Sequence, residues 1–578
     1  MAAYQERYES WLREPSLGAS LKAELQKIAG DEKEKEDRFY TELSFGTAGL
    51  RGILGAGTNR MNVHVVRRAT KGLAQYLKSC GDSCGRGVAV AYDSRHMSAE
   101  FAKEAALVLA QNGVLVYLFE SLHPVPLLSF TVRHFNCIAG IVITASHNPP
   151  QYNGYKVYWE DGGQCGPEQA GEILKAILNV PYFTALPMDE AEAIKYGLLR
   201  IIGKEVDEAY YAATQTLLQH PALLKEKGKD LKIVYTPLHG SGLVPVVTLL
   251  SRVGVSNVSV VKEQELPDGA FPTVKAPNPE DPNALKLAIE LAQSVGADVV
   301  LGTDPDADRL GVAVRPAGGA FQVLSGNQIG SLLLHYLLSS LFEKGELPKN
   351  GLVVKSIVTT RMADAICARF GIQIEDVLTG FRFISEKIEE CVRTGERKFL
   401  FGFEESFGFL AGGFSRDKDA VCAAMLLSEA CVYYREQGKT LYDVIEQMYH
   451  AYGYYKDAVK SYTLMGKEGI ERIGGAMRAL RQNPPVAFGT LKVEYAEDFT
   501  KNERVQAETG TVLPIGLPHS DVLRYFLEGG AWICVRPSGT EPKLKIYIGA
   551  NAATQAQTDA LLNELTIEAD ALVTSLLN

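Results

Sequence analysis

Apolar runs of strand length alternate with segments of helical periodicity through much of the chain. The earliest round has apolar runs at residues 88–92, 114–119 and 139–143, with a helical pattern over 99–111 between the first two. Such runs are typical of strands that are buried on both faces of a parallel sheet. The pattern therefore predicts a βαβαβ unit whose parallel strands are joined by right-handed crossovers.

The same rhythm returns twice. The strand candidates of the second and third rounds are residues 232–235, 258–261, 297–301, 352–358, 372–377 and 398–401. Beyond about residue 450 the sequence becomes richer in tyrosine and in charge, and a strand is expected at 544–548. We therefore expect an α/β fold with three units on one plan, followed by a smaller α+β domain.

The expected domains are four. Their predicted boundaries are residues 1–204, 205–316, 317–450 and 451–578. Residues 1–43 are expected to form polar helices that extend the first domain, with the charge run 31–38 as a solvated helix face. A chain of 578 residues is long enough to bury several hydrophobic cores without disulfides.

Composition and charge exclude several classes of protein. With 46% hydrophobic and 22% charged residues, the chain is expected to be a globular enzyme and not a disordered or fibrous protein. Its net charge of -10 and the lack of a basic run argue against a nucleic-acid partner. The nine cysteines are scattered without a CxxC pair, which suits a reducing compartment. No signal peptide and no stretch of about 18 apolar residues is evident. We therefore expect a cytoplasmic protein without a membrane partner.

The apolar run 139–143 leads into an abrupt polar turn at residues 144–150. In open α/β sheets the working residues lie in loops beyond the carboxyl ends of the strands. Pro149 and Pro150 stiffen this turn, because proline continues neither a helix nor a strand ladder. The turn is therefore expected to present the hydroxyl of Ser146. An ordinary polar turn without chemistry is the alternative that this motif leaves open.

The second unit ends in three aspartates at alternate positions, Asp304, Asp306 and Asp308. Three carboxylates cannot lie close together as anions without a cation, so a hard divalent ion is predicted. A calcium-binding EF-hand loop is excluded, since Arg309 and Arg315 stand where that loop needs glycine and glutamate. Magnesium beside a phosphoryl group fits better. A helix cap in a surface turn is the alternative.

Three further loops are rich in residues that can carry chemistry. Glycines surround Arg51 in residues 44–52, so a ligand can approach the backbone closely there, with a flexible turn as the alternative. The third unit ends in residues 402–408. Residues 536–543 combine an arginine, two hydroxyls, a glycine and a lysine between two strands, which is the composition of an anion-binding concavity.

Six motifs follow one another through nearly the whole chain: GTAGLRG, TASHNPPQYNGYK, TPLHG, TDPDADR, GFEESFG and RPSGTEPK. In this order they resemble the motifs of the α-D-phosphohexomutases, and in particular of the longer branch that holds phosphoglucomutases and phosphopentomutases. The resemblance implies four domains around a central cleft, the first three sharing one α/β plan.

The resemblance also implies roles for individual residues. Arg51 and Lys156 match basic residues that assist proton transfer, and Ser146 matches the serine that is phosphorylated. The implied catalytic residues are Ser146, Lys156, Arg51 and His147, and the implied metal ligands are Ser146, Asp304, Asp306 and Asp308. The implied substrate-binding residues are Arg309, Thr379, Gly380, Arg382, Glu404, Ser406, Lys418, Arg536, Ser538, Gly539, Thr540 and Lys543. Of these, Glu404 and Ser406 match a pair that binds sugar hydroxyls, and the loop around Arg536 matches one that holds the phosphate that does not react.

The implied activity is the interconversion of glucose 1-phosphate and glucose 6-phosphate through a phosphoserine and a 1,6-bisphosphate. It implies Mg²⁺ as cofactor, glucose 1,6-bisphosphate as activator, a small phosphosugar as partner, and a monomer or homodimer. Two positions differ from some relatives: Arg382 stands where glucose-type members often have lysine, and Glu405 stands where mannose-and-glucose types have methionine.

Several alternative activities stay open at this stage. Within the family these are phosphopentomutase, phosphomannomutase and glucose 1,6-bisphosphate synthase. A phosphatase with Asp304 as nucleophile would also place Asp304 and Asp306 after an apolar strand, but it would not need the serine or arginine loops. A sugar-phosphate sensor would keep the fold and lose the chemistry.

Overall fold

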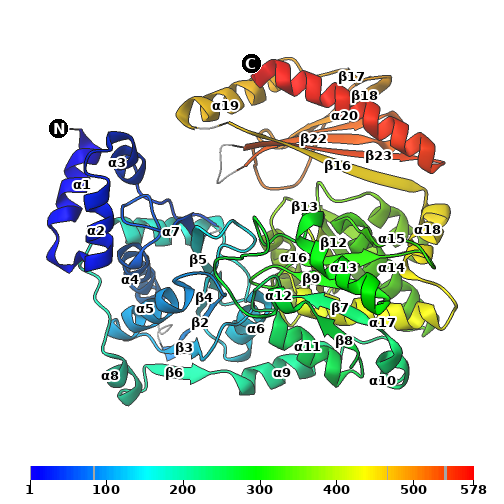
Figure 1. Cartoon of the computed structure of the whole chain (residues 1–578). Helices are drawn as coiled ribbons and strands as arrows, with labels where there is room; N and C mark the ends of the chain where they lie inside the picture. Colours follow the sequence, from blue (N-terminus) through cyan, green and yellow to red (C-terminus); the bar gives the residue numbers. More distant parts are fainter. Residues whose placement is uncertain (1, 48, 82–84, 465, 539–542, 578) are drawn as a thin grey trace. The chain divides into compact units, whose positions relative to one another are not determined.

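The computed structural model describes residues 2–47, 49–81, 85–464, 466–538 and 543–577 (Figure 1). The chain forms two compact units. The first consists of Met1–Gly326 with Ile384–Leu441, and the second of Asn327–Phe383 with Tyr442–Asn578. Within the described residues, no helix has the length and apolar character needed to cross a membrane.

The N-terminal extension is helical, as predicted. Its helices are α1 (Ala3–Arg13), α2 (Ala19–Lys27) and α3 (Glu32–Phe39). Tyr8 and Trp11 each meet Phe39 edge-on, at ring-centroid distances of 5.9 and 5.7 Å, in a small core of their own. The expectation of a solvated face is wrong for part of the charge run. Arg38 binds Glu24 and Glu34 and donates to a backbone carbonyl, so these charges join helices instead of facing water.

The first sheet lies in the first unit and is mixed. Its strands, in the order β1-β5-β4-β2-β3-β6, are β1 (Leu50–Ile53), β5 (Tyr152–Trp159), β4 (Ala139–Ile143), β2 (Val88–Tyr92), β3 (Val116–Phe119) and β6 (Leu199–Ile202). Its helices are α4 (Val63–Ser79), α5 (Ser98–Gln111), α6 (Val125–His134), α7 (Pro167–Leu178) and α8 (Glu190–Lys195). Strand β2 pairs in parallel with β3 and β4, which confirms the predicted βαβαβ unit.

The second sheet has the strand order β11-β10-β9-β7-β8. Its strands are β7 (Ile233–Thr236), β8 (Val258–Val260), β9 (Val299–Thr303), β10 (Leu310–Val314) and β11 (Gln322–Val323). The helices around it are α9 (Lys204–Gln215), α10 (Pro221–Lys227), α11 (Leu243–Arg252), α12 (Lys262–Glu265) and α13 (Lys286–Val295). The first unit also holds the hairpin of β14 (Lys398–Glu404) and β15 (Gly408–Ala411), and α17 (Ala420–Arg435).

The sheets contain the predicted parallel strands but are mixed, and the predicted functional loops explain why. Residues 144–151, 304–309 and 405–407 each turn the chain back along the strand that precedes them. β5 therefore runs antiparallel to β4, β10 to β9, and β15 to β14. A short polar turn leaves no room for a crossover helix, which a parallel connection requires. The loops predicted to carry the chemistry are hairpin turns at the carboxyl ends of central strands.

The second unit contains the parallel pair β12 (Gly351–Ser356) and β13 (Gln373–Val377), with α15 (Met362–Phe370) between them. Helices α14 (Gly326–Glu343), α16 (Phe381–Thr394) and α18 (Leu441–Tyr452) begin near the unit boundaries. The C-terminal part is an antiparallel sheet in the order β16-β23-β22-β21-β18-β19-β20, covered by helices α19 and α20. Its elements are β16 (Tyr454–Thr463), α19 (Gly466–Gln482), β17 (Ala487–Phe488), β18 (Leu491–Asp498), β19 (Glu503–Gln506), β20 (Val512–Pro514), β21 (Leu523–Leu527), β22 (Trp532–Pro537), β23 (Lys543–Ala552) and α20 (Gln555–Leu577). This confirms the smaller α+β domain. The four domain boundaries stay a prediction.

Candidate active site

Ser146 lies in the turn between β4 and β5, with its backbone in the left-handed region at φ 51°. Only 4% of the residue is exposed, so the hydroxyl is enclosed and not presented on a surface turn as expected. Its Oγ donates to Oδ2 of Asp304 at 2.7 Å, across 158 positions of sequence. The imidazole Nδ1 of His147 lies 3.1 Å from the same Oγ. The serine turn and the aspartate turn therefore meet at one hydroxyl.

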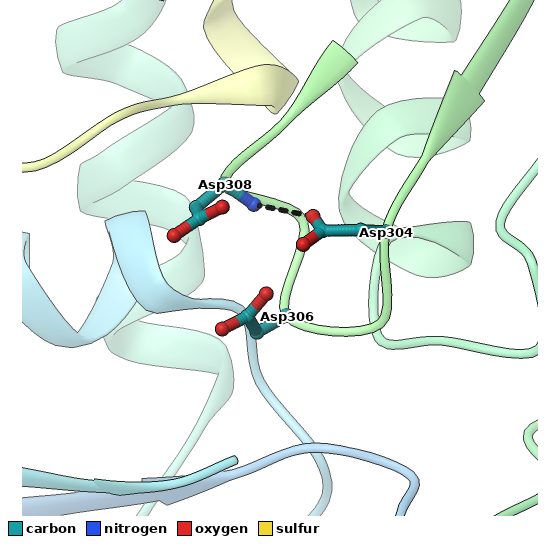
Figure 2. A group of neighbouring side chains, drawn as sticks. All are labelled: Asp304, Asp306 and Asp308. Atoms are coloured by element: carbon teal, nitrogen blue, oxygen red, sulfur yellow. Dashed lines mark hydrogen bonds between the residues drawn. The ribbon is translucent and has the colours of Figure 1, made fainter. Parts of the chain in front are cut away.

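The three aspartates of the second turn converge on one point (Figure 2). One carboxylate oxygen from each of Asp304, Asp306 and Asp308 lies within 4.8 Å of the others, and all three residues are buried. Asp304 Oδ1 accepts hydrogen bonds from the backbone N–H groups of Asp308 and Arg309, at 3.2 and 3.1 Å, which fixes the turn.

The free oxygens of this cluster fit a hard divalent cation. Oδ1 of Asp306 and Oδ1 of Asp308 are buried and have no hydrogen-bond partner among the described residues. An unsatisfied buried carboxylate oxygen is costly, and a magnesium ion prefers oxygen ligands of this kind. The donor set therefore suits the predicted metal, and the helix-cap alternative leaves two oxygens unexplained.

Electrostatics within the cluster point the same way. Burial raises the pKa of Asp304 well above its usual value, and the charges of Asp306 and Asp308 raise it further. Burial would also raise the pKa of Asp306, but the ammonium groups of Lys156 and Lys418 and the hydrogen bonds to Lys156 and Asp304 together hold that pKa below the usual range. The raised pKa of Asp304 means that a cation bound here would favour the ionised form of that carboxylate. Because metal ligands bind in their deprotonated form, metal affinity should rise with pH.

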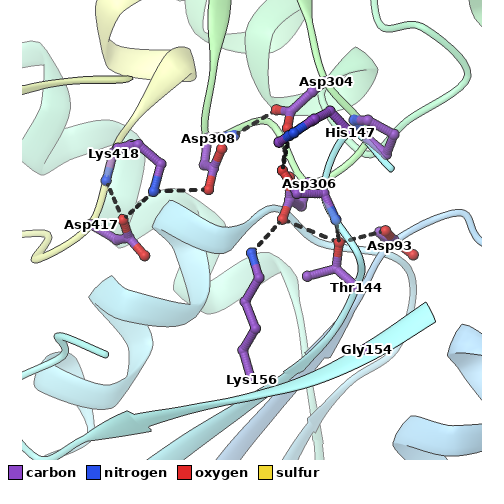
Figure 3. A network of polar contacts seen from close by, with 12 residues as sticks. Asp93, Thr144, His147, Gly154, Lys156, Asp304, Asp306, Asp308, Asp417 and Lys418 are labelled. Carbon is purple, nitrogen blue, oxygen red and sulfur yellow. Dashed lines mark hydrogen bonds and ion pairs between the residues drawn. The ribbon is translucent and has the colours of Figure 1, made fainter. Parts of the chain in front are cut away.

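Two lysines and an arginine contact the two turns, and Figure 3 shows the lysines. The Nζ of Lys156, on β5, lies 2.9 Å from Oδ2 of Asp306. The Nζ of Lys418 lies 3.1 Å from Oδ2 of Asp308 and 2.8 Å from Oδ1 of Asp417. Arg51, on β1, donates from Nη1 to the side chain of Asn148 in the serine turn at 3.2 Å.

These cations also act on His147. Burial lowers the pKa of its imidazole well below the usual value, and the charges of Arg309 and Arg51 lower it further. The ring beside the Ser146 hydroxyl is therefore neutral at physiological pH, so one of its nitrogens can accept a proton.

The third turn lies beside the aspartate turn. Arg309 forms a β-bridge with Gly408, and the N–H of Leu310 donates to the carbonyl of Phe407 at 3.1 Å. Glu404, at the end of β14, is 7% exposed, and Ser406 in the turn is half-buried. Arg309 itself pairs with Glu280. The residues predicted to bind sugar hydroxyls therefore stand next to the predicted metal site.

The remaining predicted residues lie in the second unit. Thr379 and Gly380 lie shortly after β13, which ends at Val377, and Gly380 has φ 120°, a conformation that favours glycine. The guanidinium of Arg382 lies over the ring of Phe383 at 4.6 Å. Arg536 lies near the end of β22, and the N–H of Ser538 donates to the carbonyl of Lys543 at 2.7 Å, which closes the loop. Gly539 and Thr540 fall outside the described residues. The substrate roles of all these residues stay predictions.

Sequence reasoning missed two residues of this site, Asp93 and Arg95. Both follow β2, and both contact the serine turn. The signal was present, because polar residues directly after a buried strand had marked the other functional loops. Asp417, which accepts from Lys418 and from the hydroxyl of Tyr158 at 2.6 Å, was missed for lack of such a signal.

Comparison with known proteins decides the family. Four family models match in chain order: "Phosphoglucomutase/phosphomannomutase, alpha/beta/alpha domain I" over residues 42–182, domain II over 209–318, domain III over 325–452 and the C-terminal domain over 491–566. The chain belongs to the phosphoglucomutase/phosphomannomutase family. The α-D-phosphohexomutase resemblance and the four-domain plan are thereby confirmed, and the chain is a phosphosugar mutase, an isomerase.

Individual members of the phosphoglucomutase/phosphomannomutase family are similar over most of their length. "Phosphoglucomutase" of Staphylococcus aureus (strain MRSA252) is 37% identical over 517 residues, which cover 89% of this chain and 91% of the relative. "Phosphoglucomutase" of Staphylococcus haemolyticus (strain JCSC1435) is 37% identical over 518 residues, which cover 89% of this chain and 92% of the relative. Among solved structures, a "putative phosphomannomutase" from Thermus thermophilus is 25% identical, with a TM-score of 0.69 over 92% of this chain and 99% of that one.

Proposed function

We propose that this mutase interconverts glucose 1-phosphate and glucose 6-phosphate through phospho-Ser146 and a glucose 1,6-bisphosphate intermediate. The observation that carries the proposal is the placement of the Ser146 hydroxyl 2.7 Å from Asp304, at the edge of a buried three-carboxylate cluster. A phosphoryl group on that oxygen would carry about two negative charges near pH 7 and would stand beside the cluster.

Mg²⁺ is the proposed cofactor, held by Asp304, Asp306 and Asp308 with an oxygen of phospho-Ser146. When bound, it supplies neutralisation of charge and Lewis-acid polarisation of the phosphoryl group. When ionised, the carboxylates are acceptors only, and two of their oxygens lack hydrogen-bond partners among the described residues. The predicted second role of Ser146, as a metal ligand, is part of this proposal.

Phosphoryl transfer needs positioning and charge stabilisation more than covalent work by the protein. The free hydroxyl of the sugar phosphate attacks the phosphorus, the new O–P bond forms, and the bond to Ser146 Oγ breaks. The attacking hydroxyl loses a proton and the serine oxygen gains one. His147 lies 3.1 Å from that oxygen with a neutral ring, and Lys156 and Arg51 provide cations on the β5 and β1 side of the turn. We propose that these three residues handle the proton and the charge.

Reaction at both ends of the sugar requires that the bisphosphate reverse its orientation within the protein. In one orientation its 1-phosphate faces the serine, and in the other its 6-phosphate does. We propose that Glu404 and Ser406 bind sugar hydroxyls beside Arg309, with Lys418, Thr379, Gly380 and Arg382 as further substrate ligands. The loop with Arg536, Ser538, Gly539, Thr540 and Lys543 would hold whichever phosphate does not react.

Three attendant properties belong to the same proposal. Glucose 1,6-bisphosphate is expected to act as activator, because it rephosphorylates any enzyme that has lost its phosphoryl group. A small phosphosugar is the expected partner of a monomeric or homodimeric enzyme. The cytoplasm is the expected compartment, since it holds sugar phosphates and keeps the scattered cysteines reduced.

The test is a comparison of substrates with the purified enzyme, Mg²⁺ and a trace of the matching bisphosphate. Glucose 1-phosphate is expected to have a higher kcat/KM than mannose 1-phosphate or ribose 1-phosphate, followed by NMR of the phosphorus signals. Preference for either of the others would favour phosphomannomutase or phosphopentomutase. Net accumulation of bisphosphate would favour the synthase, and release of inorganic phosphate would favour the phosphatase. Binding without turnover would favour a sensor.

Arg536→Ala is expected to weaken substrate binding by one to two decades. A charge-assisted contact between arginine and phosphate contributes about 1.5–3 kcal/mol, and about 1.4 kcal/mol is a decade of affinity. Because the bisphosphate intermediate must bind again after it reverses its orientation, activity should also depend more steeply on added glucose 1,6-bisphosphate. Steady-state kinetics with Arg478→Ala as control, an exposed arginine of α19, measures both effects. A wild-type KM without extra need for bisphosphate would show that Arg536 does not hold the distal phosphate.

A further inference from the structure

We propose that Asp93 and Arg95 are positioning residues that hold the serine turn in the conformation needed for phosphoryl transfer. The inference rests on the proposed function in one respect, that Ser146 carries the phosphoryl group. It adds two residues that touch neither metal nor substrate in the scheme above, and that act on the reaction only through the backbone and side chains of the turn.

Arg95 binds the serine turn through hydrogen bonds from its guanidinium group. Its side chain is fully buried and donates to the backbone carbonyls of three residues of the turn and of the first residue of β5. These are Ser146 at 2.6 Å, Asn148, Pro149 at 2.9 Å and Tyr152 at 3.0 Å. A planar guanidinium with five N–H donors in fixed directions can serve several carbonyls at once, which the single ammonium of lysine cannot do in the same geometry.

Asp93 accepts hydrogen bonds from Thr144, the first residue of the turn, and from Arg95. Its Oδ2 accepts from the hydroxyl of Thr144 at 2.6 Å, and the Thr144 hydroxyl in turn accepts from the N–H of Ser146 at 2.8 Å. Oδ1 of Asp93 accepts from the N–H of Arg95 at 2.9 Å and from the hydroxyl of Ser98 at 2.7 Å. The carboxylate therefore ties the turn to the first residues after β2 and to the start of α5.

The turn needs such support because Ser146 has a backbone conformation that residues other than glycine rarely adopt. Its φ is 51°, and a residue held in the left-handed region persists only where its surroundings over-determine it. Here the N–H of Ser146 is bound through Thr144 and its carbonyl through Arg95. Both peptide groups beside the reacting hydroxyl are thus fixed by the Asp93–Arg95 pair.

The same network reaches the aspartate turn (Figure 3). The hydroxyl of Thr144 lies 3.1 Å from Oδ2 of Asp306, the oxygen that also binds Lys156. Asp93, Thr144 and Asp306 therefore form a chain of contacts between the ends of β2, β4 and β9. Weakening the contacts of Asp93 should shift the serine relative to the carboxylate cluster, and a shift near 1 Å costs about 100-fold in rate.

The experiment compares Arg95→Lys, Arg95→Ala and Asp93→Asn with the wild type under saturating Mg²⁺. We expect each variant to lose about 100-fold or more in kcat, while KM for glucose 1-phosphate stays within about threefold, since no proposed substrate ligand is altered. Added guanidinium ion should raise the kcat of Arg95→Ala about tenfold. It should not raise the rate of Arg95→Lys, whose cavity is filled. Arg68→Lys is the matched control, because Arg68 is another buried arginine of the same region, bound to Glu42 and to the carbonyl of Val180.

Folded Arg95 and Asp93 variants with kcat within about threefold of the wild type would overturn the proposal, and so would equal losses in the Arg68→Lys control. Should the Arg95 variants fail to fold, Thr144→Val decides, because it keeps the shape of the side chain and removes the hydroxyl that links Asp93 to Ser146 and to Asp306. An unchanged kcat in that variant would also overturn it. The proposed function fails separately, if the wild-type enzyme turns over without ever carrying phosphate on Ser146.

Discussion

Ser146→Ala is expected to fold as the wild type does and to lose about 10⁴-fold or more in kcat, because it removes the oxygen that carries the phosphoryl group. The hydroxyl donates one hydrogen bond to Asp304, so its loss should lower the free energy of unfolding by only about 1 kcal/mol. Thermal unfolding and mutase assays measure the two effects separately.

Ser428→Ala is the matched control for that substitution. Ser428 is a buried serine of α17 in the same unit, and its hydroxyl donates to the carbonyl of Ala424 at 2.7 Å. Its replacement should have a comparable effect on stability and leave kcat near the wild-type value. Substantial activity in Ser146→Ala would show that another group accepts the phosphoryl group.

Asp306→Asn is expected to weaken Mg²⁺ binding about tenfold or more and to lower kcat by about two decades. The substitution removes one of three ligand charges, and it leaves Lys156 buried beside a neutral amide. Magnesium at a hundredfold excess over its Kd should stabilise the wild type by about 2.7 kcal/mol. The variant should need a correspondingly higher concentration for the same rise in Tm.

The control for this second substitution is Asp298→Asn. Asp298 precedes β9 at the opposite end of the strand from the aspartate turn and accepts from the N–H of Lys232 at 2.9 Å. The Mg²⁺ dependence of its Tm should match that of the wild type. Unchanged magnesium titrations in Asp306→Asn would contradict the assignment of the cluster as the metal site.

Much of the fold follows from local pattern. The runs at 88–92 and 139–143 coincide with β2 and β4, because a strand buried on both faces must be apolar throughout. Strands β1 and β5 were missed, since residues such as Asn153 and Lys156 interrupt their apolar pattern. Those polar side chains are buried in the network around the serine turn, and only that tertiary context makes them compatible with a strand.

Some residues of the candidate site could likewise be predicted from local sequence pattern, and others could not. Ser146 and the three aspartates could be predicted because each lies in a polar turn that follows a buried strand. Asp93 was equally placed and was missed, because a single aspartate after a strand is common. What distinguishes it is the partner it meets, Thr144, which lies 51 positions away. Such contacts depend on which strands pair, and the order β4-β2 is not a local property of either segment.

The most direct test of the proposed phosphoserine mechanism is peptide mapping by mass spectrometry after incubation of the wild-type enzyme with glucose 1,6-bisphosphate. We expect one phosphate, on the peptide that contains Ser146, and its transfer to glucose 6-phosphate when that substrate is added. The Ser146→Ala variant, treated in the same way, should carry none. An active enzyme without phosphate on Ser146, or with an acylphosphate on Asp304, would contradict the mechanism.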